Sequence, residues 1–324
     1  MNILVCGGAG YIGSHMVRRL QSGKYDLVVL DNLSTGHRQA IGGCELVIAD
    51  LLDTRLLEQV FAQHRFDAVM HFCAKSLIAE SMRDPCAYYL NNVAGSLNLL
   101  AAMRAHGVQR LIFSSTAAVY GMPLADTIDE DHPRIPINPY GRSKLMVEEI
   151  LHDAARAFGL RSVSLRYFNA AGASADSTIG EAHEPETHLI PNVLRAAATG
   201  APPLPVHGIN YPTRDGTCVR DYVHVEDLAD AHLAALAYLD AHEGAHAFNL
   251  GNGAGFSVLE ILRAACKVIG RDIAWVAASR RDGDPATLVA SSARAREQLG
   301  WQPRHTQIDS IIDSAWRWQR ARRY

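Results

Sequence analysis

Two side chains spaced four residues apart offer the clearest chemistry in this sequence. Tyr140 and Lys144 lie in the segment Tyr-Gly-Arg-Ser-Lys directly after Pro139, a residue type that suits the start of a helix. In a helix this spacing places both side chains on one face. A free tyrosine has a pKa near ~10, and a neighbouring ammonium group favours its phenolate form. The pair could therefore act as a general base near neutral pH, although the same spacing is common on ordinary solvated helices.

A run of hydroxyl-bearing residues ends the fifth apolar segment of the chain. Ser114, Ser115 and Thr116 stand where we expect a strand to finish. In a doubly wound sheet, ligands bind beyond the carboxyl ends of the strands. A hydroxyl group there could hydrogen-bond both a substrate hydroxyl and the Tyr140 phenol. The alternatives are a β-branched strand residue for Thr116 and a capping turn for the two serines.

A glycine-rich segment near the start of the chain is typical of a phosphate-binding turn. Residues 7–13, Gly-Gly-Ala-Gly-Tyr-Ile-Gly, satisfy the pattern G-x-G-x-x-G between an expected strand and an expected helix. Glycine permits the tight turn and lets the backbone approach a pyrophosphate, which the helix N-terminus attracts. The candidate cofactor contacts in this segment are Gly7, Gly10, Tyr11, Ile12 and Gly13.

An acidic residue ends the second expected strand, at a spacing that suits a dinucleotide site. A carboxylate at Asp31 would accept both hydroxyl groups of the adenosine ribose and repel a 2′-phosphate, so the sequence predicts NAD rather than NADP. The alternative is a glycine turn with an unrelated aspartate. Asp50, after the third strand, could lie at the adenine end. The remaining candidate cofactor contacts here are Asn32, Leu51 and Phe72.

Short apolar segments alternate with helical patterns over the first two-thirds of the chain. Apolar runs without polar alternation indicate strands that are buried on both faces, and helices between them require parallel strands. The expected strands are 2–6, 27–30, 45–48, 68–72, 110–114 and 162–167, and the expected helices are 12–21, 54–64, 88–106 and 140–158. We therefore predict an α/β fold with a doubly wound parallel (Rossmann) sheet.

The composition of the chain changes near residue 170, where we place a domain boundary. Residues 200–205 and 208–216 are rich in Gly and Pro, so loops or edge strands are expected there. Beyond the boundary we expect a strand at 219–225, a helix that Ser257 caps together with Glu260, and helices at 189–198, 226–239, 291–299 and 307–320. We predict a dinucleotide-binding domain over 1–170, completed by a returning segment near 247–250, and a smaller α/β substrate domain over 171–324.

The overall composition excludes several functional classes. The chain has 324 residues, of which 48% are hydrophobic and 20% are charged, so it can bury a large core. A net charge of -3 without a basic stripe argues against a nucleic-acid partner. No apolar run is long enough to span a membrane, and the first residues are typical of a strand rather than a signal peptide. Six scattered cysteines without metal-ligand spacing indicate free thiols in the cytoplasm and no metal site.

Several segments together resemble the UDP-glucose (UDP-galactose) 4-epimerase family of the extended short-chain dehydrogenase/reductase superfamily. The resemblance extends from Met1 to about Trp318 and is carried by residues 7–15, 114–116, 140–144, 166–169 (Arg-Tyr-Phe-Asn) and 219–225 (Val-Arg-Asp-Tyr-Val-His-Val). It implies an isomerase that interconverts UDP-glucose and UDP-galactose. The implied route is oxidation at C4 to a 4-keto sugar, rotation of that sugar and its re-reduction, all with tightly bound NAD.

The resemblance also implies roles for individual residues. Tyr140 would be the base, Lys144 would anchor the cofactor, and Thr116 would hold or relay the substrate proton. Three further residues would lie at the cofactor: Asn91, Ser114 and Tyr167. The residues implied for the diphosphate and the uridine are Asn169, Arg220, Arg281 and Asp284, and guanidinium groups suit phosphates. The alternatives are a loop ion pair between Arg281 and Asp284 and a structural pair between Arg220 and Asp221.

The sequence departs from the family at four positions. Several members have a lysine near the cofactor phosphates where this chain has Ser76, with Lys75 one place earlier. His188, which precedes the candidate contact Leu189, replaces an asparagine. His207 replaces an aromatic residue near the uracil, and its imidazole can still stack. Leu288 replaces a tyrosine that restricts other members to sugars without an acetyl group, so a bulkier 2-acetamido sugar could fit.

Other interpretations of the same residues remain open. The chain could be a 4-epimerase of another UDP-sugar, such as an N-acetylhexosamine, a glucuronate or a pentose. Sugar-nucleotide dehydratases and decarboxylases share the superfamily, but dehydratases commonly carry an Asp-Glu pair where this chain has Ala117 and Ala118. A non-catalytic NAD sensor would tend to lose the Tyr140–Lys144 pair. An ordinary NAD-linked dehydrogenase would release NADH at each turnover.

Fold analogy also predicts the assembly state. Members of this superfamily often dimerise through a four-helix bundle, and the helical segments 88–105 and 145–158 would supply it. We therefore expect a homodimer that acts on a small-molecule UDP-hexose, without a nucleic-acid or membrane partner.

Overall fold

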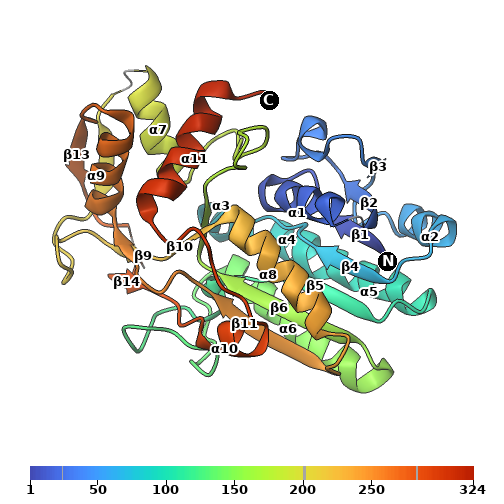
Figure 1. The fold of residues 1–324 in the computed structure, drawn as a ribbon. Coiled ribbons are helices and arrows are strands. Elements are labelled where there is room, and N and C mark those ends of the chain that lie inside the picture. Colours follow the sequence, from blue (N-terminus) through green and yellow to red (C-terminus); the bar gives the residue numbers. More distant parts are fainter. Residues whose placement is uncertain (24, 200–201, 282–283) are drawn as a thin grey trace.

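A seven-stranded sheet forms the centre of the computed structural model, which describes residues 1–23, 25–199, 202–281 and 284–324 (Figure 1). Its strands, in spatial order, are β11 (Ala245–Leu250), β6 (Arg161–Tyr167), β5 (Arg110–Ser114), β4 (Ala68–His71), β1 (Asn2–Cys6), β2 (Asp26–Asp31) and β3 (Glu45–Ile48). Each pair of neighbours runs parallel. The predicted doubly wound parallel sheet is therefore confirmed, and its strand order reverses between β1 and β4.

Helices α1 (Tyr11–Ser22) and α8 (Val225–Tyr238) cover one face of this sheet. Successive side chains of a strand point to opposite faces, so Ile3 and Val5 of β1 face this layer while Leu4 and Cys6 face the other. All four side chains are fully buried. This burial on both faces explains why the strand sequences are continuously apolar.

The opposite face is covered by α2 (Thr54–Gln63), α5 (Gly95–Ala105) and α6 (Pro139–Phe158). The helix expected over 88–106 is present but not uniform. The structure has a short α4 (Pro85–Tyr88), then a π-helical turn (Tyr89–Ala94) and then α5. A π-helical turn often marks a functional position, and this one contains the candidate residue Asn91. The short helix α3 (Ile78–Arg83) precedes it.

A second core forms among α7 (Leu189–Thr199), α9 (Val258–Ile269) and α11 (Ile308–Ala321). The expected capping box is present, because the Ser257 hydroxyl accepts from the Glu260 N–H and the Glu260 carboxylate accepts from the Ser257 N–H. Beside this core, β8 (Leu204–His207) pairs with β13 (Trp275–Ala278). Part of the loop expected over 200–205 lies outside the described residues.

The strand expected over 219–225 is split in two at Asp221. β9 (Val219–Arg220) joins β12 (Phe256–Ser257) and β14 (Thr287–Leu288), whereas β10 (Tyr222–His224) pairs with β7 (Asn169–Ala171). The buried Asp221 carboxylate accepts the backbone N–H groups of Asn252, Gly253 and Ala290. These contacts turn the chain between the two small sheets.

The chain returns to the first unit over a longer stretch than the sequence suggested. Helix α8 packs against α1, and Arg19 of α1 donates to Asp230 of α8 at 2.6 Å. Strand β11 then pairs with β6, and the short α10 (Ala293–Gln298) packs beside β11. Residues 225–250 thus belong to the packing around the large sheet, while the division of function between 1–170 and 171–324 stays a prediction. Among the described residues, no helix combines the length and apolar character needed to cross a bilayer.

Candidate functional site

The first turn of α6 brings Tyr140 to the end of β5. The Asn138 side chain accepts the Gly141 N–H at 2.8 Å and so begins the helix, with Pro139 in its first turn. A Cβ atom at Gly141 would overlap the Ala118 carbonyl oxygen, so only glycine lets α6 approach the turn that follows β5 so closely. That turn is the 3-10 helix Ala117–Val119, which Thr116 caps by accepting the Ala118 N–H. Tyr140 and Thr116 are therefore neighbours.

Lys144 lies one helical turn further along α6 and is buried against β5. Its ammonium group donates to the Ser114 carbonyl oxygen at 2.7 Å and lies 4.6 Å from the centre of the Phe113 ring. Burial lowers the pKa of Lys144 to about 7, and the nearby Cys73 and Glu148 act weakly in the other direction. The lysine is therefore a desolvated group held by the end of β5, as a cofactor anchor would require.

The Tyr140 phenol is not activated by this chain alone. Burial raises the pKa of Tyr140 above its ordinary value, and the hydrogen bond with Thr116 lowers it in part. Next to this pair, the Ser114 hydroxyl is hydrogen-bonded to the Tyr167 hydroxyl. The structure thus brings together Thr116, Tyr140, Lys144, Ser114 and Tyr167, and a further positive charge beside the phenol is needed to favour phenolate.

The residue that connects the π-helical turn to α6 is Asn92, which the sequence analysis missed. Its side chain is buried, accepts the Lys75 N–H at 2.9 Å and donates to the Ser143 hydroxyl at 2.9 Å. The predicted residue Asn91 donates to the Asn92 side chain. Asn92 therefore links α6 to the chain after β4, while the cofactor contact expected of Asn91 stays a prediction.

Lys75, the lysine displaced by one place from the family position, forms an ion pair with Glu80. The Lys75 ammonium lies 2.9 Å from the Glu80 carboxylate. The Tyr88 hydroxyl also hydrogen-bonds to Glu80. Lys75 is thereby held on α3 and α4, and its role at the cofactor phosphates stays a prediction.

The glycine turn between β1 and α1 has the shape that a pyrophosphate needs. Gly7 adopts a φ of +78°, and a Cβ there would come within 2.7 Å of the Cys73 nitrogen. A Cβ at Gly13 would overlap the Gly7 carbonyl oxygen. Gly10 begins α1 without a side-chain cap, and the first turn of α1 has no acidic residue. The N-terminus of α1 is therefore available to an anion.

Asp31 closes the other side of this turn. Its two carboxylate oxygens accept the Ala9 N–H at 2.9 Å and the Leu33 N–H at 2.8 Å. Burial raises the pKa of Asp31, and these two hydrogen bonds oppose the rise. Beyond it, the Asn32 side chain donates to Asp50 at 2.7 Å. The carboxylate keeps lone pairs for ribose hydroxyls, so these residues fit the adenosine half of a dinucleotide.

The remaining cofactor candidates mainly pack or bridge. The Tyr11 hydroxyl donates to the Gly172 carbonyl oxygen at 2.6 Å, which joins α1 to the chain after β7. Leu51 packs against Gly95 of α5, and Ile12 packs against the core under α1. The Phe72 ring lies 4.7 Å from the His232 ring of α8. A direct cofactor contact of these four residues stays a prediction.

The candidates for the nucleotide end gather around β7, β9 and β14. The Arg220 guanidinium forms an ion pair with Asp284. The alternatives considered from the sequence paired Asp284 with Arg281, and Arg220 with Asp221. Leu288 of β14 lies opposite Arg220 in the sheet register. The Asn169 side chain donates to the Asp221 carbonyl oxygen at 2.8 Å. These four residues are brought together. Arg281 is exposed in the loop before β14, where its carbonyl oxygen accepts the Asp284 N–H at 3.3 Å.

Two histidines that the sequence analysis assigned to the substrate form hydrogen bonds within the chain. His207, at the end of β8, is hydrogen-bonded through Nδ1 to the Ser279 carbonyl oxygen at 3.1 Å. His188 precedes Leu189, the first residue of α7, and is paired with Glu181. Burial and hydrogen bonding compete at His188, and the carboxylate raises its pKa above the ordinary value. The sequence analysis did not recognise this His–Glu contact.

A buried network that the sequence analysis also missed supports the site from below. The Glu148 carboxylate of α6 accepts from the Ser115 hydroxyl at 2.6 Å and from both ends of the Arg166 guanidinium. Arg166 in turn donates to the Tyr120 hydroxyl, which donates to Asn249 of β11. The network fixes α6 to β5 next to Thr116, so these residues position the site. The Arg166 position inside a strand was its only sequence signal.

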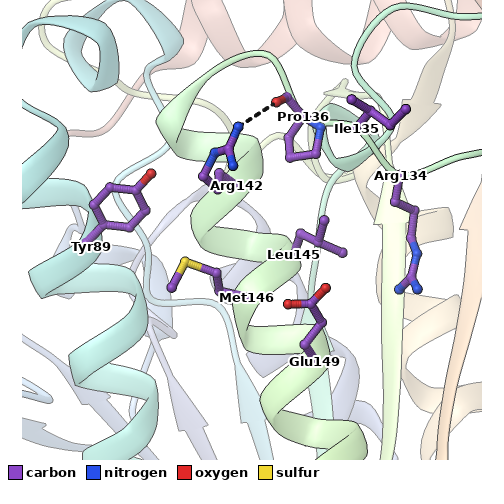
Figure 2. Close-up of a pocket in the computed structure, with 8 residues that line it drawn as sticks. All are labelled: Tyr89, Arg134, Ile135, Pro136, Arg142, Leu145, Met146 and Glu149. Atoms are coloured by element: carbon purple, nitrogen blue, oxygen red, sulfur yellow. Dashed lines mark hydrogen bonds between the residues drawn. The ribbon is translucent and has the colours of Figure 1, made fainter.

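The outer face of α6 carries a separate cavity of about 540 Å³. Figure 2 shows that Leu145, Met146 and Glu149 line it from α6, with Tyr89 on the neighbouring helix. The chain segment 134–136 closes the other side, and Arg142 donates to the Pro136 carbonyl oxygen at 3.5 Å. This cavity lies on the opposite side of α6 from Lys144 and is therefore distinct from the candidate active site.

Comparison with known proteins identifies relatives over almost the full length. A profile described as the NAD dependent epimerase/dehydratase family matches residues 3–251. The chain is 53% identical over 319 residues to a UDP-glucose 4-epimerase of Lacticaseibacillus casei, which covers 98% of this chain and 96% of the relative. 

Solved structures give the same result. A UDP-glucose 4-epimerase from Brucella ovis in complex with NAD is 47% identical, with a TM-score of 0.94 over 97% of each chain. A UDP-glucose 4-epimerase from Bifidobacterium longum in complex with NAD+ and UDP is 37% identical, with a TM-score of 0.95 over 99% of each chain. The arrangement described above is therefore similar to that of dinucleotide-binding enzymes.

The buried Lys144 predicts a specific pH dependence of stability. Because its pKa falls from 10.5 to about 7 on folding, the unfolded chain binds a proton that the folded chain lacks between these values. Stability should therefore rise with pH through this range. Lys144→Met removes the contribution, so its stability relative to the unsubstituted protein should fall as the pH rises from about 7 to about 9.

Urea unfolding of the ligand-free protein at several pH values measures this effect. The exposed Lys267 provides a matched control, because Lys267→Met removes a charge without removing a buried group. A stability difference for Lys144→Met that is constant over this pH range would contradict the inferred pKa.

Proposed function

The chain belongs to the NAD-dependent epimerase/dehydratase family, and from this we propose that it interconverts UDP-glucose and UDP-galactose with tightly bound NAD. The observation that carries the proposal is the meeting of Tyr140 and Thr116 beside the buried Lys144, at the carboxyl end of β5. The glycine turn of α1 opens toward the same edge of the sheet, since β1 and β5 run parallel. A base and a dinucleotide can thus face one substrate.

The residues around the glycine turn would hold the cofactor. The N-terminus of α1 would bind the pyrophosphate, and Asp31 would accept the adenosine ribose hydroxyls. Lys144, Ser114 and Tyr167 would lie at the nicotinamide end. When bound, NAD supplies a hydride acceptor that takes hydrogen from C4 of the sugar and returns it to the other face.

Proton transfer at the C4 hydroxyl falls to Tyr140. Thr116 would hold the hydroxyl of the sugar, or relay its proton, because it is already hydrogen-bonded with the phenol. Burial keeps the pKa of Tyr140 high, so the positive nicotinamide ring together with the Lys144 ammonium must favour the phenolate. The pKa of Tyr140 then depends on whether NAD is bound. Without NAD, the Tyr140 phenol stays protonated.

The nucleotide would be held by groups that do not react. Asp284 orients the Arg220 guanidinium, whose remaining N–H groups suit a phosphate. Asn169 and the exposed Arg281 would add to the diphosphate contacts, with His188, Leu189 and His207 as further substrate contacts. Binding energy concentrated in the nucleotide would leave the sugar loosely held, so that it could turn and present either face to the cofactor site.

The chain lacks the side chains that a sugar-nucleotide dehydratase would need after Thr116. A 4,6-dehydratase needs a second acid and base beside the substrate, but Ala117 and Ala118 occupy the turn directly after Thr116. Six free cysteines fit a reducing compartment, so we also propose a cytoplasmic location.

We further propose that two copies of the chain form a homodimer through α5 and α6. Leu90, Leu97 and Met146 are large apolar side chains that are exposed on or beside these helices, at 57%, 46% and 39% of their surface. The cavity in Figure 2 borders the same face. A second copy that packs its helices there would bury this apolar surface.

The main test follows UDP-galactose in the purified protein without added dinucleotide. UDP-glucose should form, as measured by chromatography, and Tyr140→Phe should lower the rate by about 100-fold or more because the general base is lost. Tyr238→Phe is the matched control, because Tyr238 lies on α8 and packs against His242. A near-normal rate in Tyr140→Phe would overturn the assignment of the base.

Leu288 predicts the range of accepted sugars. It is partly buried in β14 and packs against the cluster formed by Ala117, Val119 and Tyr120. Because leucine leaves more room than tyrosine, the protein should also convert UDP-N-acetylglucosamine. Leu288→Tyr should lower that turnover about tenfold while UDP-galactose turnover changes little, since a misfit of this size costs about 1–3 kcal/mol. Absence of any turnover of the acetylated sugar by the unsubstituted protein would refute this prediction.

The dimer proposal predicts a mass of about twice 35.3 kDa in light scattering. Leu97→Glu combined with Met146→Glu should produce monomers, because two buried carboxylates would be desolvated in the interface. Trp275→Glu is the control, since Trp275 is comparably exposed on β13 of the other unit. A monomeric unsubstituted protein, or an unchanged mass of the double variant, would rule out this interface.

A further inference from the structure

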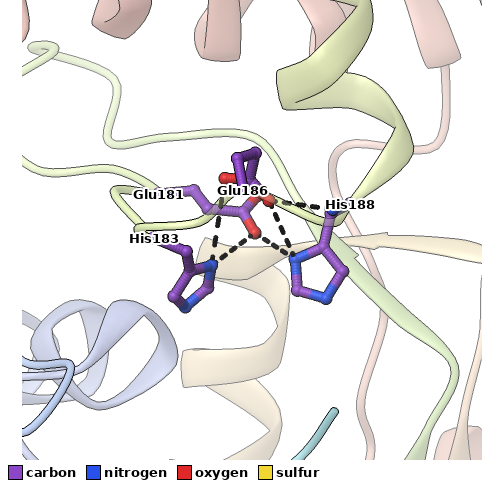
Figure 3. Close-up of side chains that lie close together, drawn as sticks. All are labelled: Glu181, His183, Glu186 and His188. Atoms are coloured by element: carbon purple, nitrogen blue, oxygen red, sulfur yellow. Dashed lines mark hydrogen bonds and ion pairs between the residues drawn. The ribbon is translucent and has the colours of Figure 1, made fainter. Parts of the chain in front are cut away.

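Four potential metal ligands gather in one short segment that ends at His188, which is also a proposed substrate contact. The segment 181–188 follows the small sheet strand β7 and leads into α7, with the sequence Glu-Ala-His-Glu-Pro-Glu-Thr-His. Glu181, His183, Glu186 and His188 each offer one ligand atom, and these atoms lie within 4.8 Å of one another. Figure 3 shows all four side chains directed toward a common centre.

We infer that Glu181, His183, Glu186 and His188 form a binding site for a divalent transition-metal cation, with Zn²⁺ as the best match. Two imidazole nitrogens and two carboxylate oxygens are a tetrahedral donor set that suits zinc. Mg²⁺ and Ca²⁺ prefer oxygen ligands alone and higher coordination numbers. The sequence analysis predicted no metal site, because the cysteines lack metal-ligand spacing and the histidines are dispersed along the chain.

The burial of charge in the segment carries the inference. The Glu181 and Glu186 side chains are only 6% and 7% exposed. In the described part of the chain, their ion-pair partners are the two imidazoles, and no lysine or arginine joins them. Two desolvated carboxylates that face each other are unfavourable unless positive charge is supplied. A divalent cation supplies both charges while the imidazoles remain neutral ligands.

Three of the four imidazole–carboxylate distances suit a four-coordinate ion, whereas the His188–Glu181 contact is shorter and would have to lengthen when an ion binds. Zinc bonds of about 2.0–2.1 Å in a tetrahedron place neighbouring ligand atoms about 3.3 Å apart. The His183 Nδ1 atom lies 3.1 Å from Glu181 Oε1 and 4.0 Å from Glu186 Oε2. The His188 Nδ1 atom lies 3.7 Å from Glu186 Oε1 and in close contact with Glu181. Both imidazoles present the same nitrogen, Nδ1, toward the two carboxylates.

The ligands are held in place by a supporting shell. The Glu186 carboxylate accepts the backbone N–H groups of Thr187 and His188 at 2.7 and 2.8 Å. The Trp318 side chain of α11 donates to the Glu181 carbonyl oxygen at 2.8 Å. The His183 ring lies edge-on to Tyr11 of α1, with centroids 6.4 Å apart. A bound ion would therefore fix the segment between α1, α7 and α11, which is a structural role.

A second cluster of potential ligands in the described residues has too few free ligand atoms to form such a site. His224, Glu226 and His305 are also close together. However, His224 already accepts the Glu226 N–H through Nδ1 and is bonded to Ser314 through Nε2. Both of its nitrogens are used, so this cluster offers too few free ligands and provides a matched control.

The test measures zinc binding directly. The protein is stripped with a chelator, dialysed against ZnCl₂ and analysed for zinc per chain by mass spectrometry. The unsubstituted protein and His305→Gln should each bind one equivalent, whereas His183→Gln and Glu181→Gln should bind more than about 100-fold more weakly, because each loses a ligand. Equal zinc binding by the unsubstituted protein and His183→Gln, or loss of zinc in His305→Gln, would overturn the site.

Co²⁺ bound to the unsubstituted protein gives a readout that does not depend on any variant folding. An intense visible absorption typical of tetrahedral Co²⁺ should appear at one equivalent and disappear when Zn²⁺ is added. A weak octahedral spectrum, or a titration without a stoichiometric end point, would show that the cluster is held together by protons alone and would refute the proposal.

Discussion

The close approach of α6 to the turn after β5 is the constraint on which the candidate site depends. Glycine at position 141 removes the side chain that would otherwise overlap the Ala118 carbonyl oxygen. Because of this approach, the first turn of α6 carries Tyr140 to Thr116 and the second carries Lys144 to the Ser114 carbonyl. A helix held even slightly further from the sheet would separate the phenol from its hydroxyl partner.

Polar groups buried around α6 maintain this arrangement. Asn92 ties α6 to the chain after β4, and Glu148 ties it to Arg166 and Ser115. Such networks favour one packing because breaking any one bond leaves a buried polar group unpaired. The side of α6 that carries these hydrogen bonds faces the sheet. Its other side carries exposed apolar residues and the cavity of Figure 2. One helix thus serves both the proposed chemistry and the proposed dimer.

The electrostatics of the site suit a reaction that begins and ends with the same cofactor. Burial raises the pKa of Tyr140 and lowers that of Lys144 to about 7, so burial disfavours the charged form of both groups. In the proposed function, the positive charge of bound NAD would shift that balance toward phenolate at Tyr140.

The sequence by itself determined the sheet and the positions of the reactive groups along it. Continuous apolar runs specify parallel strands buried on both faces, and ligand-binding residues must then follow the strand ends, as Asp31 and Thr116 do. The spacing of Tyr140 and Lys144 fixes their common helix face. These features are local, or follow from one periodic pattern, so they can be read without coordinates.

Only the tertiary structure decided which distant groups meet. Asn92 bonds to Ser143 of α6, and Arg220 of β9 pairs with Asp284, which shortly precedes the neighbouring strand β14. The return of α8 to the large sheet was equally hidden, since its apolar face could have covered either core. Side-chain partners far apart in the chain, and the pKa shifts that burial causes, depend on packing and not on sequence spacing.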